Sequence, residues 1–188
     1  MSSIPRRPVV RGPEAVRPVD NGEVKRPSPA PLAPGQESVW DYPRPPAVDR
    51  VDRRVVVVFG GVTVVDTRDV VRVRETSHPP VYYLKISDFA PESLVEAAGS
   101  SWCEFKGRAA YFDLVAGGRR ADGVGWTYPE PARGYGLLDG RVALYAGPMD
   151  AVTIDGETVI PQPGGFYGGW ITHEVAGPFK GGPGSSGW

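Results

Sequence analysis

The residues best suited to chemistry in this sequence fall in two short segments, residues 75–80 (ETSHPP) and residues 102–107 (WCEFKG). Glu75 continues an alternating run in which Val71 and Val73 share one face, so its carboxylate is expected to point inward. A carboxylate on an apolar face must be paired, hydrogen-bonded or protonated. We therefore expect Glu75 either to tie down the loop that follows it or to act as a general acid/base or ligand anchor.

The second segment brings a thiol and an ammonium group close together in the chain. Lys106 stands before Gly107, where the strand is expected to break, and it would pair with Glu75 across the sheet, contact a ligand or remain solvated. An ammonium beside Cys103 would favour the reactive thiolate, whereas most free cysteines are buried and inert. Glu75, Lys106 and Cys103 are thus the candidate catalytic residues, and whether the protein is an enzyme stays open.

A binding cleft is the other use that these segments suggest. His78 precedes two prolines that hold it extended, and its neighbour Ser77 then points to the opposite side, which disfavours a Ser–His–acid triad. Aromatic residues from several strands would line a cleft that is apolar with a few polar groups. The predicted ligand-binding residues are Glu75, Ser77, His78, Tyr83, Lys106, Tyr111 and Trp126.

The sequence holds few metal ligands and no phosphate-binding glycine motif. Cys103 is the only cysteine, and His78 and His173 are the only histidines, so neither an internal disulfide nor a Cys-x-x-Cys zinc site can form. Neither GxxxxGK(S/T) nor strand-GxGxxG-helix is present. We predict that the protein uses no metal and no cofactor.

Charge and hydropathy narrow the choice of partner. The formal net charge is −1, so no global field attracts nucleic acid or an anionic membrane. No apolar stretch near a terminus is long enough to span a membrane, and no signal-peptide pattern opens the chain. We expect a cytoplasmic protein that binds neither nucleic acid nor membrane, with a small-molecule ligand as partner and a homodimer as an alternative.

Three dipeptides predict the architecture that would position these residues. Gly60-Gly61, Gly117-Gly118 and Asp155-Gly156 each separate two runs rich in Val, Ile, Thr or aromatic residues. A two-residue hairpin loop needs positive φ, which glycine adopts at no steric cost. The protein is therefore predicted to be mainly β and antiparallel. Strands are expected at 54–59, 62–66, 69–75, 82–84, 102–115, 141–146 and 150–160.

One short helix is expected among these strands. It would span residues 91–98, with Pro91 in its first turn and Gly99 as its stop. A short turn or helical piece is expected at 131–139.

Composition divides the chain into four parts. Residues 1–36 contain eight prolines and few apolar residues, and are expected to be a disordered arm. Residues 37–52, with two large aromatics, are expected to be an extended strap, and 53–163 the β domain. Residues 164–188 hold nine glycines and five aromatics, which predicts an irregular tail packed on its own domain or on a partner subunit.

Four segments in order resemble the domain of unknown function 427 family: residues 75–83 (ETSHPPVYY), 103–113 (CEFKGRAAYFD), 125–131 (GWTYPEP) and 142–145 (VALY). The resemblance implies a β-tent-like domain, in which two antiparallel sheets meet at an angle over a cleft. It also implies that four residues lie around this cleft, namely Glu75, Cys103, Lys106 and Tyr111. Zinc-bearing relatives of that fold use paired cysteines that this chain lacks, and the family has no established activity to transfer.

These observations lead to one functional expectation and two alternatives. We expect the protein to bind a small polar or aromatic ligand in the cleft. The first alternative is a metal-independent enzyme that uses Glu75 as acid/base with Lys106 and Cys103. The second is a homodimeric interaction module that binds through its aromatic tail.

Overall fold

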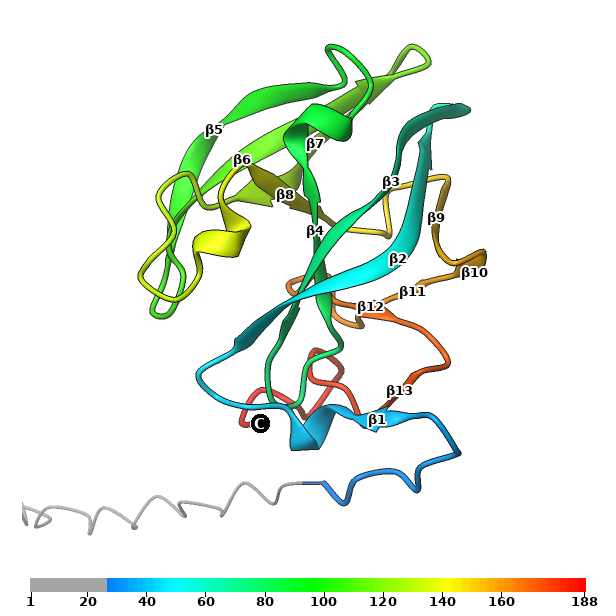
Figure 1. Ribbon diagram of the computed structural model, residues 1–188, viewed down its shortest axis with the longest axis vertical. Coiled ribbons are helices and arrows are strands. Elements are labelled where there is room, and N and C mark those ends of the chain that lie inside the picture. Colours follow the sequence, from blue (N-terminus) through cyan, green and yellow to red (C-terminus); the bar gives the residue numbers. More distant parts are fainter. Residues whose placement is uncertain (1–26) are drawn as a thin grey trace, which may run out of the picture.

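The computed structural model describes residues 27–188 (Figure 1). Its strands are β1 Glu37–Ser38, β2 Ala47–Phe59, β3 Val62–Arg74, β4 Val81–Lys85, β5 Leu94–Cys103, β6 Gly107–Ala116, β7 Arg119–Thr127, β8 Arg141–Leu144, β9 Ala151–Ile154, β10 Glu157–Thr158, β11 Ile160–Pro161, β12 Trp170–Ile171 and β13 Val175–Ala176. Its helical turns are η1 Val39–Asp41, η2 Ile86–Asp88 and η3 Gly136–Leu138, each a 3₁₀ helix of three residues.

Nine of these strands form one large antiparallel sheet, in the order β10-β9-β2-β3-β4-β8-β7-β6-β5. Two small sheets complete the fold, the antiparallel pair β11–β12 and the parallel pair β1–β13. The prediction of a mainly β, antiparallel fold is therefore confirmed. No helix among residues 27–188 has the length and apolar character needed to cross a membrane.

The three predicted hairpins are confirmed, because their turn residues all have positive φ. Gly60-Gly61 joins β2 to β3, Gly117-Gly118 joins β6 to β7, and Asp155-Gly156 joins β9 to β10. Their φ angles lie between 49° and 86°, as the two-residue turn of type I′ requires.

Two of these turns also touch each other, although they close different parts of the sheet. A Cβ on Gly60 would lie 2.2 Å from the carbonyl oxygen of Ala116, and one on Gly117 would lie 1.8 Å from that of Gly60. Asp150 links the two tips, since it accepts the Gly61 amide at 2.8 Å and binds Arg119. The sheet must therefore curl strongly between β2 and β7 (Figure 1).

The predicted helix at 91–98 is wrong, because that segment enters β5. Leu94 pairs with Leu114 and the ladder continues to the end of the strand, with a bulge around Gly99 at φ 99°. The residues have moderate helix propensity, but Glu92 at φ 61° interrupts the backbone, and pairing with β6 outweighs local preference.

Two boundaries also differ from the expected ones. The large sheet begins at Ala47, so residues 47–52 of the expected strap belong to β2 and pair with 69–74. The strand expected over 102–115 is instead the β5–β6 hairpin, in which Cys103 pairs with Gly107. Gly107 has φ 99° and starts the second strand.

The strap and the tail pack on the sheet of their own chain. Trp170 is 1% exposed, donates to the Leu144 carbonyl at 3.0 Å and stacks on Tyr82. Residues 27–36 lie along the tail, where the Ala30 amide donates to Gly177, whereas residues 1–26 of the expected arm lie outside the described part.

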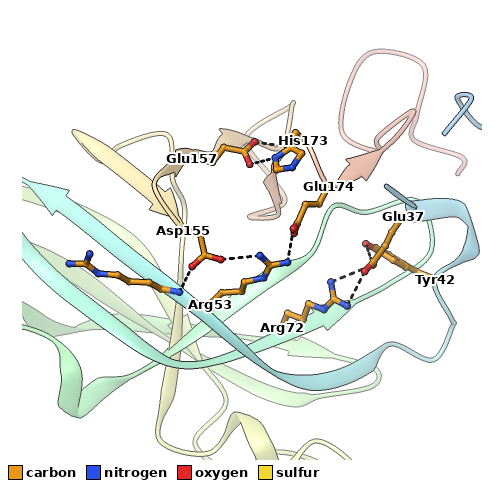
Figure 2. A network of polar contacts seen from close by, with 9 residues as sticks. Glu37, Tyr42, Arg53, Arg72, Asp155, Glu157, His173 and Glu174 are labelled. Carbon is orange, nitrogen blue, oxygen red and sulfur yellow. Dashed lines mark hydrogen bonds and ion pairs between the residues drawn. The ribbon is translucent and has the colours of Figure 1, made fainter. Parts of the chain in front are cut away.

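Ion pairs fasten these appendages to the long strands (Figure 2). Arg53 on β2 bridges Asp155 at 2.9 Å and Glu174 at 2.5 Å. Arg72 on β3 binds Glu37 of the strap at 3.2 Å, and the same carboxylate accepts from the Tyr42 hydroxyl. The tail and the strap therefore have fixed positions, and they can contribute side chains to a site.

The two faces of the large sheet carry separate hydrophobic clusters. Alternation in β4 sends Leu84 into the larger cluster and Tyr83 into the smaller one. The smaller cluster is covered by the loop that contains η3, through Tyr135 and Leu138. A cavity opens beside this smaller cluster.

Candidate functional site

The cavity has a volume of about 480 Å³ and collects side chains from many parts of the chain. Strands β3 to β7 of the large sheet and the loops between its strands supply most of the lining, and the strap, the tail and Gln162 after β11 supply the remainder. Its aromatic lining consists of Tyr83, Trp102, Tyr111, Trp126, Tyr128, Tyr145, Phe166 and Tyr167. Its charged or titratable lining consists of Arg44, Glu75, His78, Cys103, Lys106 and Lys180, besides the tyrosines.

Most of the residues predicted from the sequence meet at this cavity. They are Glu75, His78, Tyr83, Cys103, Lys106, Tyr111 and Trp126. Ser77 does not line it. The Ser77 amide donates to Val39 and its carbonyl accepts from Lys180, so this buried residue at φ 70° joins the strap to the tail.

Hydrogen bonds and close packing organise the aromatic wall. The buried Tyr83 hydroxyl accepts from Trp126 Nε1 at 3.0 Å, and Trp126 packs on Tyr145 with ring centroids 4.8 Å apart. Burial raises the pKa of both Tyr83 and Tyr128, so these phenols stay protonated at neutral pH. The tail closes on this wall through Gly168, where a Cβ would lie 2.1 Å from the Trp126 ring.

Lys106 is a buried cation without a partner among residues 27–188. It is 8% exposed, and its ammonium lies 6.0 Å from the Tyr128 ring centroid, with neither an ion pair nor a hydrogen bond within the described chain. The turn between β5 and β6 fixes its backbone, whose carbonyl accepts from the Ala132 amide at 3.0 Å.

Glu75 does not form the ion pair with Lys106 that the sequence suggested. Its carboxylate binds Arg44 at 3.2 Å, and Arg44 also binds Glu104 at 2.9 Å. Arg44 of the strap, and not Lys106, therefore binds this carboxylate, because the strap places its guanidinium at the end of β3. As a result, Lys106 has no ion-pair partner among residues 27–188.

The Gln162 amide determines the tautomer of His78. Its oxygen accepts from the Gly169 amide at 3.0 Å, so its nitrogen must donate to the Lys180 carbonyl at 2.8 Å and to His78 Nδ1 at 3.0 Å. His78 therefore carries its proton on Nε2. Burial, with the nearby charges of Lys180, Arg44 and Lys106, lowers the pKa of His78 to about 4. The ring is neutral at pH 7 and offers an N–H donor.

Sequence reasoning did not select most of the other lining residues, among them four that carry polar or charged groups from outside the large sheet. Arg44 comes from the strap, and Gln162, Tyr167 and Lys180 come from the segment after β11. The glycine and aromatic density of the tail indicates a wrap on the domain, but no local pattern marks Gln162 or Lys180 as site residues. Only long-range packing brings them to the cavity.

The donor set of the cavity does not suit a metal ion. Within residues 27–188, no three His, Cys, Asp or Glu side chains gather closely enough to hold one. A second cavity of about 330 Å³ shares Tyr145, Gln162 and Tyr167 with the first, and Asp122, which is paired with Arg120, is the one charged residue that lines it. The first cavity is therefore the candidate site.

The fold and the cavity define a mainly β protein with an aromatic, cation-lined cleft. Residues 47–155 match the family described as domain of unknown function (DUF427), which is more than half of the chain. The chain therefore belongs to this family, as the resemblance in the sequence indicated. No curated protein matches the chain. Arg44, Gln162, Tyr167 and Lys180 lie outside the matched residues, so the strap and the segment after β11 add lining residues to a cavity that is built mostly by the family domain.

Proposed function

We propose that the protein binds a small molecule with a planar aromatic part in the 480 Å³ cavity. The observation that carries this proposal is the combination of size and lining. Pockets of about 300–1,000 Å³ that are largely apolar, with a few converging polar groups, are typical of small-molecule sites. Here the lining combines eight aromatic side chains with two donors that have no partner among residues 27–188, the Lys106 ammonium and His78 Nε2–H.

Binding is favoured over acid–base catalysis by the state of the candidate groups. A general base needs a free acceptor within reach of the substrate proton. Glu75 is held by Arg44, and His78 Nδ1 is occupied by Gln162. The enzyme alternative then depends on Cys103, a half-buried thiol at the end of β5.

Binding is also favoured over association through the tail. Trp170 is buried on its own sheet, and Trp188 packs on Trp40 of the strap. Phe166, which is 76% exposed, is the tail aromatic left for a partner, and it also lines the cavity. A homodimer formed through the tail would therefore use Phe166, which also lies at the rim of the cavity.

Filling the cavity tests the proposal. Ala109 on β6 lines the cavity and is 3% exposed, whereas its neighbour Ala110 points to the other face of the strand. We expect Ala109→Leu to abolish binding of the neutral probe indole-3-carboxamide, measured by shifts of the Trp126 indole N–H signal. Ala110→Leu should bind as the wild type does. Equal binding by both variants would contradict the proposal.

A further inference from the structure

We propose that the ligand of this cavity carries an oxyanion, a carboxylate or a phosphate, which Lys106 and His78 Nε2–H bind together. This inference rests on the proposed function and specifies the chemical class of the ligand. It follows from the charges in the cavity, the unpaired state of Lys106 and the donor character of His78.

The charges in the cavity are not balanced. Three cations line it, Arg44, Lys106 and Lys180, but Glu75 is the one lining carboxylate within the described chain. Arg44 already binds that carboxylate and that of Glu104, and the Lys180 ammonium donates to the main-chain oxygen of Trp188. The site therefore has an excess of positive charge, and Lys106 is the lining cation whose charged group has neither an ion pair nor a hydrogen bond within residues 27–188.

Lys106 as a residue is 8% exposed, and an ammonium in so enclosed a position without a counterion is costly, since its desolvation is not offset by an ion pair. The backbone of Lys106 is held in the β5–β6 turn, where Gly107 has positive φ and the Ala132 amide donates to the Lys106 carbonyl. Among the fully buried side-chain nitrogen and oxygen atoms of the described chain, Arg72 Nε alone lacks a hydrogen-bond partner. The Lys106 nitrogen also lacks one, so it is not fully buried and keeps some contact with the cavity. Lys106 is thus open to the cavity, and an anion entering there would supply the missing counterion.

His78 adds a second donor and no competing acceptor. The Gln162 amide occupies Nδ1 and leaves Nε2–H without a partner among residues 27–188. The three cations that help to lower the pKa of His78 also indicate a positive potential at the ring. A neutral N–H donor in a positive potential is suited to an anionic acceptor, and unsuited to a cationic ligand.

The aromatic wall supplies the rest of the recognition. Tyr128 lies beside Lys106, and Trp126 and Tyr83 continue the wall from β7 and β4. Trp102, which is 76% exposed, also lines the cavity. The ligand class that fits is therefore a small aromatic molecule with one anionic substituent.

Matched probes separate this inference from the proposed function. We would measure dissociation constants of the full chain for indole-3-carboxylate and indole-3-carboxamide, which differ in charge but hardly in shape. The phosphate arm compares 1-naphthyl phosphate with 1-naphthol. We expect at least one anion to bind about tenfold or more tightly than its neutral counterpart, which corresponds to about 1.4 kcal/mol.

Lys106→Met should remove that preference by weakening the binding of the anionic probe about tenfold or more relative to its neutral counterpart. Lys85→Met is the matched control, because Lys85 lies outside the cavity and binds Asp69. Neutral probes that bind as tightly as both anions would overturn the oxyanion inference and leave the proposed function standing. Failure of all four probes to bind would overturn both. If Lys106→Met does not fold, the wild-type comparison decides alone.

Discussion

Gln162 donates a hydrogen bond to His78 Nδ1 at 3.0 Å, across 84 positions of the chain. His78 lies inside the residues that match the family and Gln162 lies outside them. The segment after β11 therefore sets the tautomer of a histidine in the family domain. This contact makes that segment a part of the site.

The pH dependence of stability should report the buried, cation-rich surroundings of His78. The pKa of His78 is about 4 in the folded chain and about 6.5 in the unfolded one, so the unfolded state binds the proton more readily. The contribution is fully present above pH 6.5 and is lost as the pH falls towards 4. We expect about 3 kcal/mol of unfolding free energy to be lost by pH 4 through this group.

Urea unfolding of the wild type and of His78→Gln between pH 7 and pH 4 measures this loss. The variant lacks the titrating group, so its stability should fall less steeply, while the other groups titrate in both. Parallel pH profiles for the two chains would show that His78 is not held neutral by its surroundings.

Lys106→Met should stabilise the chain when no ligand is bound. The methionine keeps most of the apolar stem and removes a buried charge that has no counterion within the described residues. We expect a gain of about 1 kcal/mol or more in unfolding free energy. Lys85→Met should give no such gain, since it breaks the ion pair with Asp69. A loss of stability in Lys106→Met would mean that the ammonium has a stabilising partner.

The packing of the tail can be tested with two tryptophans of opposite exposure. Trp170→Ala should cost about 3–5 kcal/mol, because the side chain is 1% exposed and donates to the Leu144 carbonyl. Trp102→Ala, at a site that is 76% exposed, should change stability by about 0.5 kcal/mol or less. Similar unfolding midpoints for the two variants would argue against a docked tail.

The contact between the two hairpin tips predicts different costs at adjacent glycines. Gly118→Ala meets only the strain of a φ of 72°, because no atom lies within 4 Å of its new Cβ, and should cost about 1–2 kcal/mol. Gly117→Ala has a similar φ, but its Cβ would lie 1.8 Å from the Gly60 carbonyl oxygen. We expect Gly117→Ala to be clearly less stable in denaturant unfolding. Equal losses would mean that the tips do not touch.

Local signals in the sequence were sufficient for the hairpins. A two-residue turn requires positive φ at its own residues, so Gly60-Gly61 and Asp155-Gly156 could be recognised without the rest of the chain. The segment at 91–98 failed for the opposite reason. Its helix signals were also local, but the ladder from Leu94 to Leu114 depends on a partner strand and outweighed them.

The candidate site divides in the same way. Glu75, Lys106 and the aromatic residues could be selected from the sequence, because their types and strand positions are local properties. The partner of each charge could not be selected in this way, because it depends on which distant segment the tertiary fold places beside that charge. Arg44 takes Glu75, Gln162 fixes His78, and Lys106 is left without a counterion among residues 27–188. Tertiary packing alone therefore decided the sign of the charge in the cavity.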